Sequence, residues 1–137
     1  MKGLLLDTHV WIWLMEGLPN LPHKVQKMIN VEVQNTKVCI AAISMWEISM
    51  LVIKERIILE KPMLTWINDA LTPLGIELEQ LTPEIAVESC YLPDSFHGDP
   101  ADRLIVATAR VNSLALITHD KKMIEYGKKN YVTVIEV

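Results

Sequence analysis

Short apolar segments alternate with helical segments along the chain, and this alternation is the strongest constraint on its fold. Runs rich in Val, Ile and Leu bounded by polar residues predict buried strands, whereas apolar residues spaced three and four apart predict helices. Neighbouring parallel strands require a crossover connection, which is usually a helix. We therefore expect an α/β fold, a three-layer α/β/α sandwich around a mostly parallel sheet of four to five strands.

The sequence places these elements in a definite order. The predicted strands are Lys2–Leu6, Lys37–Ala41, Ile76–Leu81, Leu114–Thr118 and Tyr131–Ile135. The predicted helices are Val10–Leu14, Leu21–Gln34, Ala42 or Ser44 to Lys54, Pro62–Leu71, a segment starting at Pro83, Pro100–Asn112 and Asp120–Tyr126. Alternating apolar and acidic residues make Ile76–Leu81 an edge strand with one solvated face. Gly127 is expected to close the last helix.

Length and composition favour a single domain over residues 1–137. The chain is 50% hydrophobic, enough to bury a core without disulfides, and contains no linker-like stretch. Asp7 and His9 interrupt the apolar start, so no signal peptide is expected, and no stretch is long enough to span a bilayer. A cytoplasmic protein is predicted, with Cys39 and Cys90 as buried reduced thiols.

The formal net charge of −4 argues against a protein that holds nucleic acid through a broadly basic surface. Contact with a polyanion must then be local, with divalent cations neutralising acidic side chains at the point of contact. The candidate phosphate contacts are Lys54, Arg56, Arg103, Arg110, Lys121 and Lys122. Arg103 is favoured because it adjoins the acidic Asp102.

Acidic residues stand where predicted strands hand over to the following helices. These residues are Asp7, Glu47, Asp99, Asp102 and Asp120. In an open parallel sheet, side chains beyond the carboxyl ends of the strands meet in one crevice. Clustered carboxylates repel one another unless a cation lies between them, and Mg²⁺ or Mn²⁺ prefers such oxygen ligands. The pattern favours phosphodiester hydrolysis assisted by a divalent ion.

Helix capping is an alternative explanation for several of these acids. Residues 44–47 match a capping box, and Asp99 followed by Pro100 matches an N-cap with proline at the first helical position. Glu47, Asp99 and Asp120 are therefore left open between capping and catalysis. Asp7 is less easily explained by capping alone, because it directly follows three leucines and is costly to bury.

Four segments resemble PIN domains, and in particular VapC-type toxins, over essentially the whole chain. They are residues 5–9 (LLDTH), 43–48 (ISMWEI), 97–109 (HGDPADRLIVATA) and 116–120 (LITHD). Each segment alone is weakly specific, whereas the four in this order are strongly so. The resemblance implies a Mg²⁺- or Mn²⁺-dependent endoribonuclease that acts as the toxin of a toxin-antitoxin pair.

The resemblance also implies roles for individual residues. The family's acidic quartet, which supplies metal ligands and catalytic carboxylates, falls on Asp7, Glu47, Asp102 and Asp120. The implied supporting residues are Asp99, Thr8, Thr118 and Arg103. Asp99 either caps the following helix or supports the site from outside the metal ligands.

An RNA substrate, a homodimer and a cognate antitoxin that covers the site are further implications of the resemblance. The chain has more large apolar residues near helix starts than a small core needs, and either interfaces or the core explain them equally well. They are Trp11, Trp13, Met45, Trp46, Met50 and Trp66. The histidines lack zinc spacing and receive no catalytic role; His9 and His119 are expected to point away from the neighbouring acids.

Other functions are kept as alternatives. A housekeeping PIN nuclease would process RNA and would lack a neighbouring antitoxin reading frame. A haloacid-dehalogenase-like phosphatase needs an acid at position 9, where His9 stands, and a receiver domain needs a phosphorylatable Asp that Lys37–Ala41 does not supply. A non-catalytic Mg-binding interaction module is separated from the nuclease by metal titration.

Overall fold

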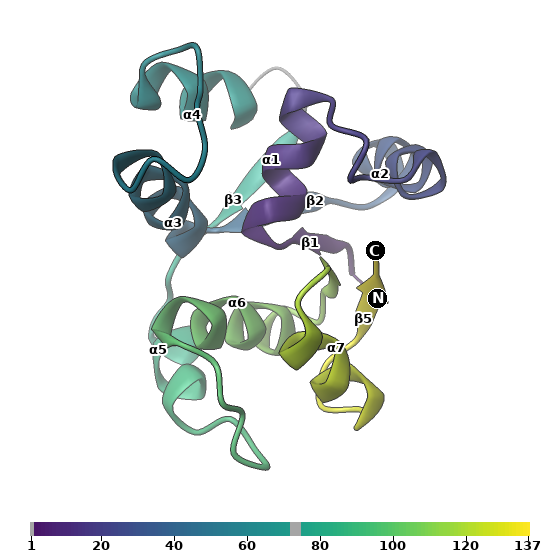
Figure 1. The fold of residues 1–137 in the computed structure, drawn as a ribbon. Coiled ribbons are helices and arrows are strands. Elements are labelled where there is room, and N and C mark those ends of the chain that lie inside the picture. Colours follow the sequence, from purple (N-terminus) through teal and green to yellow (C-terminus); the bar gives the residue numbers. More distant parts are fainter. Residues whose placement is uncertain (1, 72–74) are drawn as a thin grey trace.

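The fold is a parallel sheet with helices on both faces, seen in a computed structural model that describes residues 2–71 and 75–137 (Figure 1). The strands are β1 (Leu4–Leu6), β2 (Val38–Ala41), β3 (Ile76–Glu79), β4 (Ala115–Thr118) and β5 (Val134–Glu136). The helices are α1 (Thr8–Glu16), α2 (His23–Asn35), α3 (Ala42–Ile53), α4 (Met63–Leu71), α5 (Pro83–Cys90), α6 (Pro100–Val111) and α7 (Lys121–Lys128). The predicted α/β sandwich is confirmed.

The strands lie in the order β3-β2-β1-β4-β5, and every neighbouring pair is parallel. The chain builds outward from β1 through β2 to β3 in one direction, then starts again on the other side of β1 with β4 and β5. The order therefore reverses between β1 and β4. Beyond the carboxyl ends of two such strands an open α/β sheet leaves its binding crevice.

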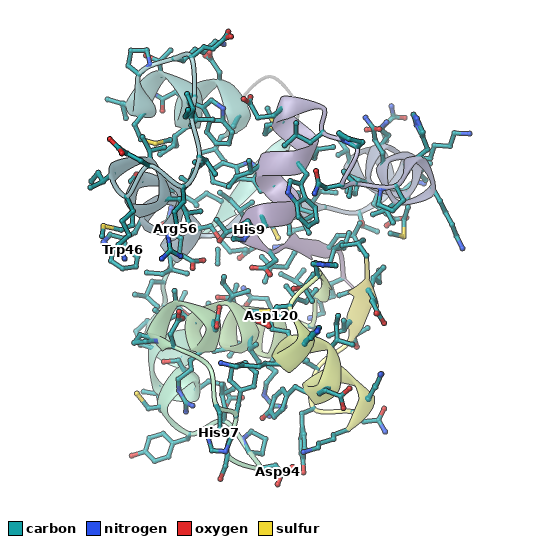
Figure 2. All side chains as sticks on the ribbon, viewed as in Figure 1. His9, Trp46, Arg56, Asp94, His97 and Asp120 are labelled. Atoms are coloured by element: carbon teal, nitrogen blue, oxygen red, sulfur yellow. The ribbon has the colours of Figure 1, made fainter. Side chains whose placement is uncertain are left out.

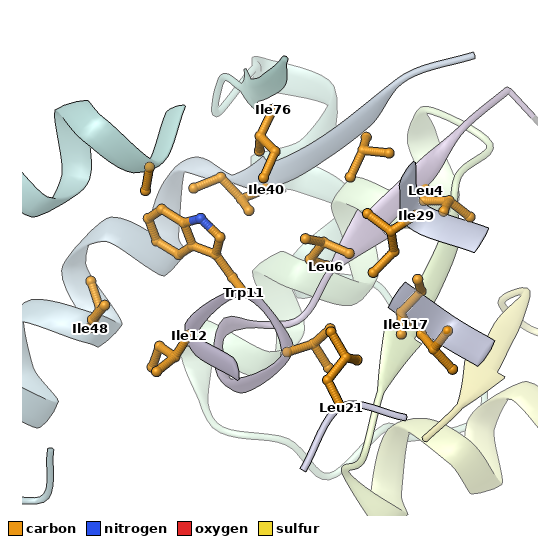
Figure 3. Packing of buried hydrophobic residues seen from close by; sticks show 14 of the residues in the cluster. Leu4, Leu6, Trp11, Ile12, Leu21, Ile29, Ile40, Ile48, Ile76 and Ile117 are labelled. Atoms are coloured by element: carbon orange, nitrogen blue, oxygen red, sulfur yellow. The ribbon is translucent and has the colours of Figure 1, made fainter. Parts of the chain in front are cut away.

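Alternation along β1 sends side chains into two cores. Leu4 and Leu6 pack in one core with residues of α1, α2, α3 and α4, including Trp11 of α1, and with Ile117 of β4 (Figure 3). Leu5 packs on the opposite face with residues of α5, α6 and α7. All three leucines are fully buried because β1 is covered on both faces, which explains its continuous apolar run. Figure 1 shows the two helical layers on either side of the sheet.

Several boundaries and environments differ from the sequence prediction. α3 begins at Ala42, directly after β2, which is the earlier of the two predicted starts. α7 continues through Gly127, where a Cβ would lie 2.7 Å from Cγ2 of Val134, so this glycine permits close helix–strand packing instead of closing the helix. The last strand starts later than predicted, at Val134. Cys39 is buried as expected, but the prediction for Cys90 is wrong, because the last turn of α5 exposes it.

The tryptophans divide between core and surface. Trp11 and Trp66 are buried and meet edge to face with ring centroids 5.0 Å apart. Trp46, by contrast, is 56% exposed on α3. No helix in the described ranges combines the length and apolarity that a membrane span requires.

The burial of β1 predicts a large effect of shortening one of its leucines. Leu6→Ala removes a fully buried side chain in a sheet that cannot collapse around the cavity, so the free energy of unfolding should fall by about 2–5 kcal/mol. Ile58→Ala, at a side chain 90% exposed, should leave it within about 0.5 kcal/mol. Urea denaturation measures both; equal losses would contradict the assignment of β1 to the core.

Candidate active site

Asp7 follows β1 and is held by two hydrogen bonds. Its backbone pairs with β4 through Asp7 N–H and the Ile117 carbonyl at 3.0 Å. Its Oδ1 accepts from the Thr8 N–H at 2.8 Å, which caps α1, and its Oδ2 accepts from the Thr118 hydroxyl at 2.6 Å. Burial nevertheless raises the pKa of Asp7, because these two bonds only partly replace the lost hydration.

Glu47 reaches the same region from α3. The Thr8 hydroxyl donates to its Oε1 at 2.6 Å and lies 2.8 Å from the hydroxyl oxygen of the fully buried Ser44. The predicted capping box is therefore wrong: the N-cap of α3 is Ala41, which makes no side-chain cap, and the helix already includes Ser44. Both polar residues turn toward Thr8 across the α1–α3 contact.

An aspartate caps each of three helices that begin around the pocket, whereas Ala41 at the start of α3 makes no side-chain cap. Asp7 caps α1, Asp99 caps α6 by accepting from the Asp102 N–H at 2.8 Å, and Asp120 caps α7 by accepting from the Lys122 N–H at 3.1 Å. Asp102 lies in the first turn of α6. The partial positive charge at three helix N-termini offsets part of the repulsion among the acids.

The acids line one open pocket of about 440 Å³. They are Asp7, Glu47, Asp99, Asp102 and Asp120. Figure 2 shows the site between the two helical layers, with His9 and Arg56 on one side and Asp120 on the other. Segments far apart in the sequence thus contribute carboxylates to one space, as the parallel topology predicts.

Burial and neighbouring carboxylates raise the pKa values of Asp102 and Glu47. Burial, together with the charges of Asp99, Asp120, Asp7 and Glu47, raises the pKa of Asp102 to about 7. Burial likewise raises the pKa of Glu47, with smaller contributions from Asp7 and Asp99. Mutual repulsion of this kind is what a bound cation relieves.

The donor set fits a hard divalent cation by its chemistry, since every acid offers carboxylate oxygens. Within residues 2–71 and 75–137, no three His, Cys, Asp or Glu side chains are arranged closely enough to form a finished metal site. The fit therefore rests on the shared pocket and on the raised pKa of Asp102.

The predicted supporting residues have different placements. Thr8 and Thr118 are buried and bond directly to the acids Glu47 and Asp7, respectively. The Thr118 hydroxyl also accepts from the Asp120 N–H at 3.0 Å. Arg103 is not among the residues lining the pocket: its guanidinium donates to the carbonyls of Ser89 and Phe96, holding the connection between α5 and α6.

Arg56, one of the candidate phosphate contacts, lines the pocket. Sequence reasoning gave no site role to four other lining residues: His9, Trp13, Leu51 and His119. The expectation that both histidines point away from the acids is wrong, because it rested on strand alternation. His9 lies in the first turn of α1, and His119 follows β4, so neither position alternates as a strand does. The spacing of His9 and Trp13, one helical turn apart, was the available signal.

A family model for the PIN domain matches residues 4–129. The chain belongs to the PIN domain family. Ribonuclease VapC22 of Mycobacterium tuberculosis is 33% identical to this PIN protein over 135 residues, which cover 98% of this chain and 99% of the relative.

Solved structures agree on the fold. The crystal structure of VapBC2 from Rickettsia felis bound to a promoter DNA fragment matches with a TM-score of 0.72 and 15% identity, covering 97% of each chain. A toxin-antitoxin complex from Klebsiella pneumoniae matches with a TM-score of 0.65 and 22% identity over 98% of this chain and all of that one. The PIN protein therefore has the architecture of these chains.

The raised pKa of Asp102 predicts a stability that depends on pH. The folded protein keeps this proton up to about pH 7, whereas the unfolded chain releases it near pH 4, so the free energy of unfolding falls as pH rises between these values. Because Asp102 is only half-buried, solvent screening reduces the loss to about 1–2 kcal/mol.

Asp102→Asn should remove this loss in buffer containing a chelator. Above pH 7 we expect its melting temperature to exceed that of the parent by on the order of 5 °C, with little difference near pH 4. Asp69→Asn, at an exposed ion pair with Lys61, is the matched control and should show no such pH-dependent gain. If the melting temperatures of the parent and Asp102→Asn changed with pH in the same way, the raised pKa of Asp102 would be contradicted.

Proposed function

We propose that this PIN protein is a metal-dependent endoribonuclease. The observation that supports the proposal is the convergence of five carboxylates on one open pocket at the carboxyl end of the sheet. Clustered carboxylates are the ligands of Mg²⁺ or Mn²⁺ in sites that act on phosphate esters. The relative named a ribonuclease extends over nearly the whole chain, which supports RNA as the substrate.

In this proposal Asp7, Glu47, Asp102 and Asp120 are the metal ligands and catalytic carboxylates. A bound Mg²⁺ or Mn²⁺ supplies charge neutralisation and an activated water at the phosphoryl group. Thr118 fixes the Asp7 carboxylate, and Thr8 fixes that of Glu47, so each acid is oriented before any ion enters. Asp99 adds negative charge at the pocket and holds the start of α6.

Arg56 is the proposed phosphate contact, in place of Arg103. Its side chain lines the acid pocket from the segment after α3, whereas the Arg103 guanidinium is occupied by two backbone carbonyls. A guanidinium beside clustered carboxylates can hold one oxygen of an RNA phosphate while the acids hold the cation.

We further propose that the protein is the toxin of a toxin-antitoxin pair and acts in the cytoplasm. The structural matches described as VapBC and toxin-antitoxin complexes support a cognate antitoxin as partner. A homodimer is proposed on the same family grounds, and sedimentation equilibrium of the purified chain measures it. A housekeeping nuclease is the second candidate within this fold, and it would need no inhibitory partner.

Neutralising a proposed ligand should abolish cleavage without unfolding the protein. We expect Asp7→Asn and Asp102→Asn each to reduce Mg²⁺-dependent RNA cleavage by at least about a hundredfold, because the loss of one carboxylate weakens both metal binding and charge stabilisation. Asp69→Asn on α4 serves as the matched control and should keep full activity. Full activity of either site variant, with its circular dichroism unchanged, would refute the assignment.

Removing the proposed phosphate contact should weaken substrate binding. We expect Arg56→Ala to raise KM about three- to tenfold with a smaller effect on kcat, and to lower the slope of affinity against salt by about one. Lys24→Ala on the exposed side of α2 removes the same charge elsewhere and should change neither. A KM for Arg56→Ala equal to that of the parent would exclude the contact.

The biological role is tested by sequencing RNA ends after brief expression of the wild type beside Asp7→Asn. RNA ends found only with the wild type identify the target and the cleaved sequence. Growth arrest that a protein encoded next to this gene relieves, by binding this chain, would favour the toxin over the housekeeping nuclease. Cleavage without arrest, and without such a partner, would favour the housekeeping role.

A further inference from the structure

Three aromatic rings form one wall of the acid pocket. Trp13 of α1 lies between two histidine rings, with centroids 6.3 Å from that of His9 and 5.8 Å from that of His119. All three line the pocket that holds the acids, and both histidines are exposed. His119 is oriented further by Nδ1, which lies 2.6 Å from the Val137 carbonyl oxygen. We call these three residues the aromatic wall.

Trp13 also lines a second hollow next to the acid pocket. This hollow, of about 290 Å³, is formed by the end of α1, the connection to α2 and the first turns of α2, including Pro19, Pro22 and His23. The indole therefore stands between the two spaces. A chain bound at the acids and continuing along this face would pass over the aromatic wall.

Charge alone gives this pocket little affinity for a nucleic acid strand. Five carboxylates line it, and Arg56 is the only lysine or arginine side chain among the described residues that does so. Where phosphate contacts are few, unpaired bases gain affinity by stacking on aromatic side chains, and every base offers a face for this. The aromatic wall supplies such rings beside the acids. Among the described residues that line the acid pocket, no other residue is aromatic.

We propose that the aromatic wall, centred on Trp13, stacks one unpaired base of the RNA next to the phosphate that the acids hold. The inference rests on the proposed ribonuclease function for the identity of the ligand. It implies that single-stranded RNA is favoured over paired RNA, because a base within a duplex has both faces covered. It also gives the enzyme a contact that persists when the metal is absent.

Binding of single-stranded RNA of about eight nucleotides tests the proposal. The measurements use Asp7→Asn as the parent, so that the RNA stays intact, and follow the anisotropy of a labelled oligonucleotide. We expect Trp13→Ala to lower the affinity between about five- and a hundredfold. Trp13→Phe, which keeps a ring, should recover most of it. Tyr91→Ala, which removes a ring 77% exposed outside the acid pocket, should bind like the parent.

A second arm changes the RNA and leaves the protein intact. Abasic nucleotides are placed at each position in turn, and we expect one position to weaken binding to the parent as much as Trp13→Ala does. The same abasic RNA should cause no further loss in Trp13→Ala, because ring and base act as one contact. If Trp13→Ala fails to fold, the abasic scan is run on the parent and Trp13→Phe: both should lose affinity at the same single position, because both keep a ring. A scan with no such position in either protein would exclude stacking.

Several results would overturn the inference. Equal affinity of the parent and folded Trp13→Ala excludes stacking, and a loss that is independent of every abasic position assigns Trp13 to packing of α1. An effect of Trp13 on binding of a partner protein, but not of RNA, assigns the wall to that protein. If the wild type cleaves RNA but Trp13→Ala binds RNA as tightly as the parent, the stacking proposal fails and the nuclease proposal stands. If the wild type does not cleave RNA but Trp13→Ala weakens RNA binding, the nuclease proposal fails and the stacking contact stands.

Discussion

The Asp7 carboxylate lies at the end of a strand buried on both faces, where burial removes most of its hydration and protein partners replace it. One oxygen is held by the amide of Thr8 and the other by the hydroxyl of Thr118. A buried carboxylate without hydrogen-bond partners would strongly destabilise the fold. The two hydrogen bonds reduce this cost, so that Asp7 can lie directly after the buried central strand. The same Thr118 hydroxyl accepts the amide of Asp120, and the Thr8 hydroxyl binds Glu47. Thr118 thus links Asp7 to Asp120, and Thr8 links Asp7 to Glu47.

The clustering of carboxylates in one pocket costs stability through mutual repulsion, and it provides the ligands for a cation. Capping places each aspartate at a helix start, where the backbone dipole favours negative charge, yet the caps of α1, α6 and α7 converge on a single pocket. Neighbouring carboxylates and burial together hold the pKa of Asp102 at about 7. Capping and function are therefore not competing explanations here, because the stabilising cap geometry is also what assembles the charged site.

The sequence predicted the architecture and the acids because both follow from periodic patterns. Apolar runs ending in polar residues indicated parallel strands, and topology brought Asp7, Asp102 and Asp120 to one edge. Neighbours in the sequence did not predict side-chain partners. Arg103 follows Asp102 directly, but its guanidinium donates to the carbonyls of Ser89 and Phe96. Nor did it reveal the ring contacts of Trp13, which depend on the path of the chain between β4 and α7. Such contacts are set by tertiary packing and leave no periodic signal.

The bond between Asp7 and Thr118 joins residues 111 positions apart. β4 is a neighbour of β1, and Asp120 follows β4 as the N-cap of α7. A nascent chain on the ribosome therefore cannot complete the acidic site until β4 and Asp120 have left the exit tunnel. Fragments that end before β4 carry Asp7, Glu47 and Asp102 without the strand that orders them. Such fragments lack both the Thr118 hydroxyl that orients Asp7 and the Asp120 carboxylate, so the acidic site forms only after β4 has joined β1.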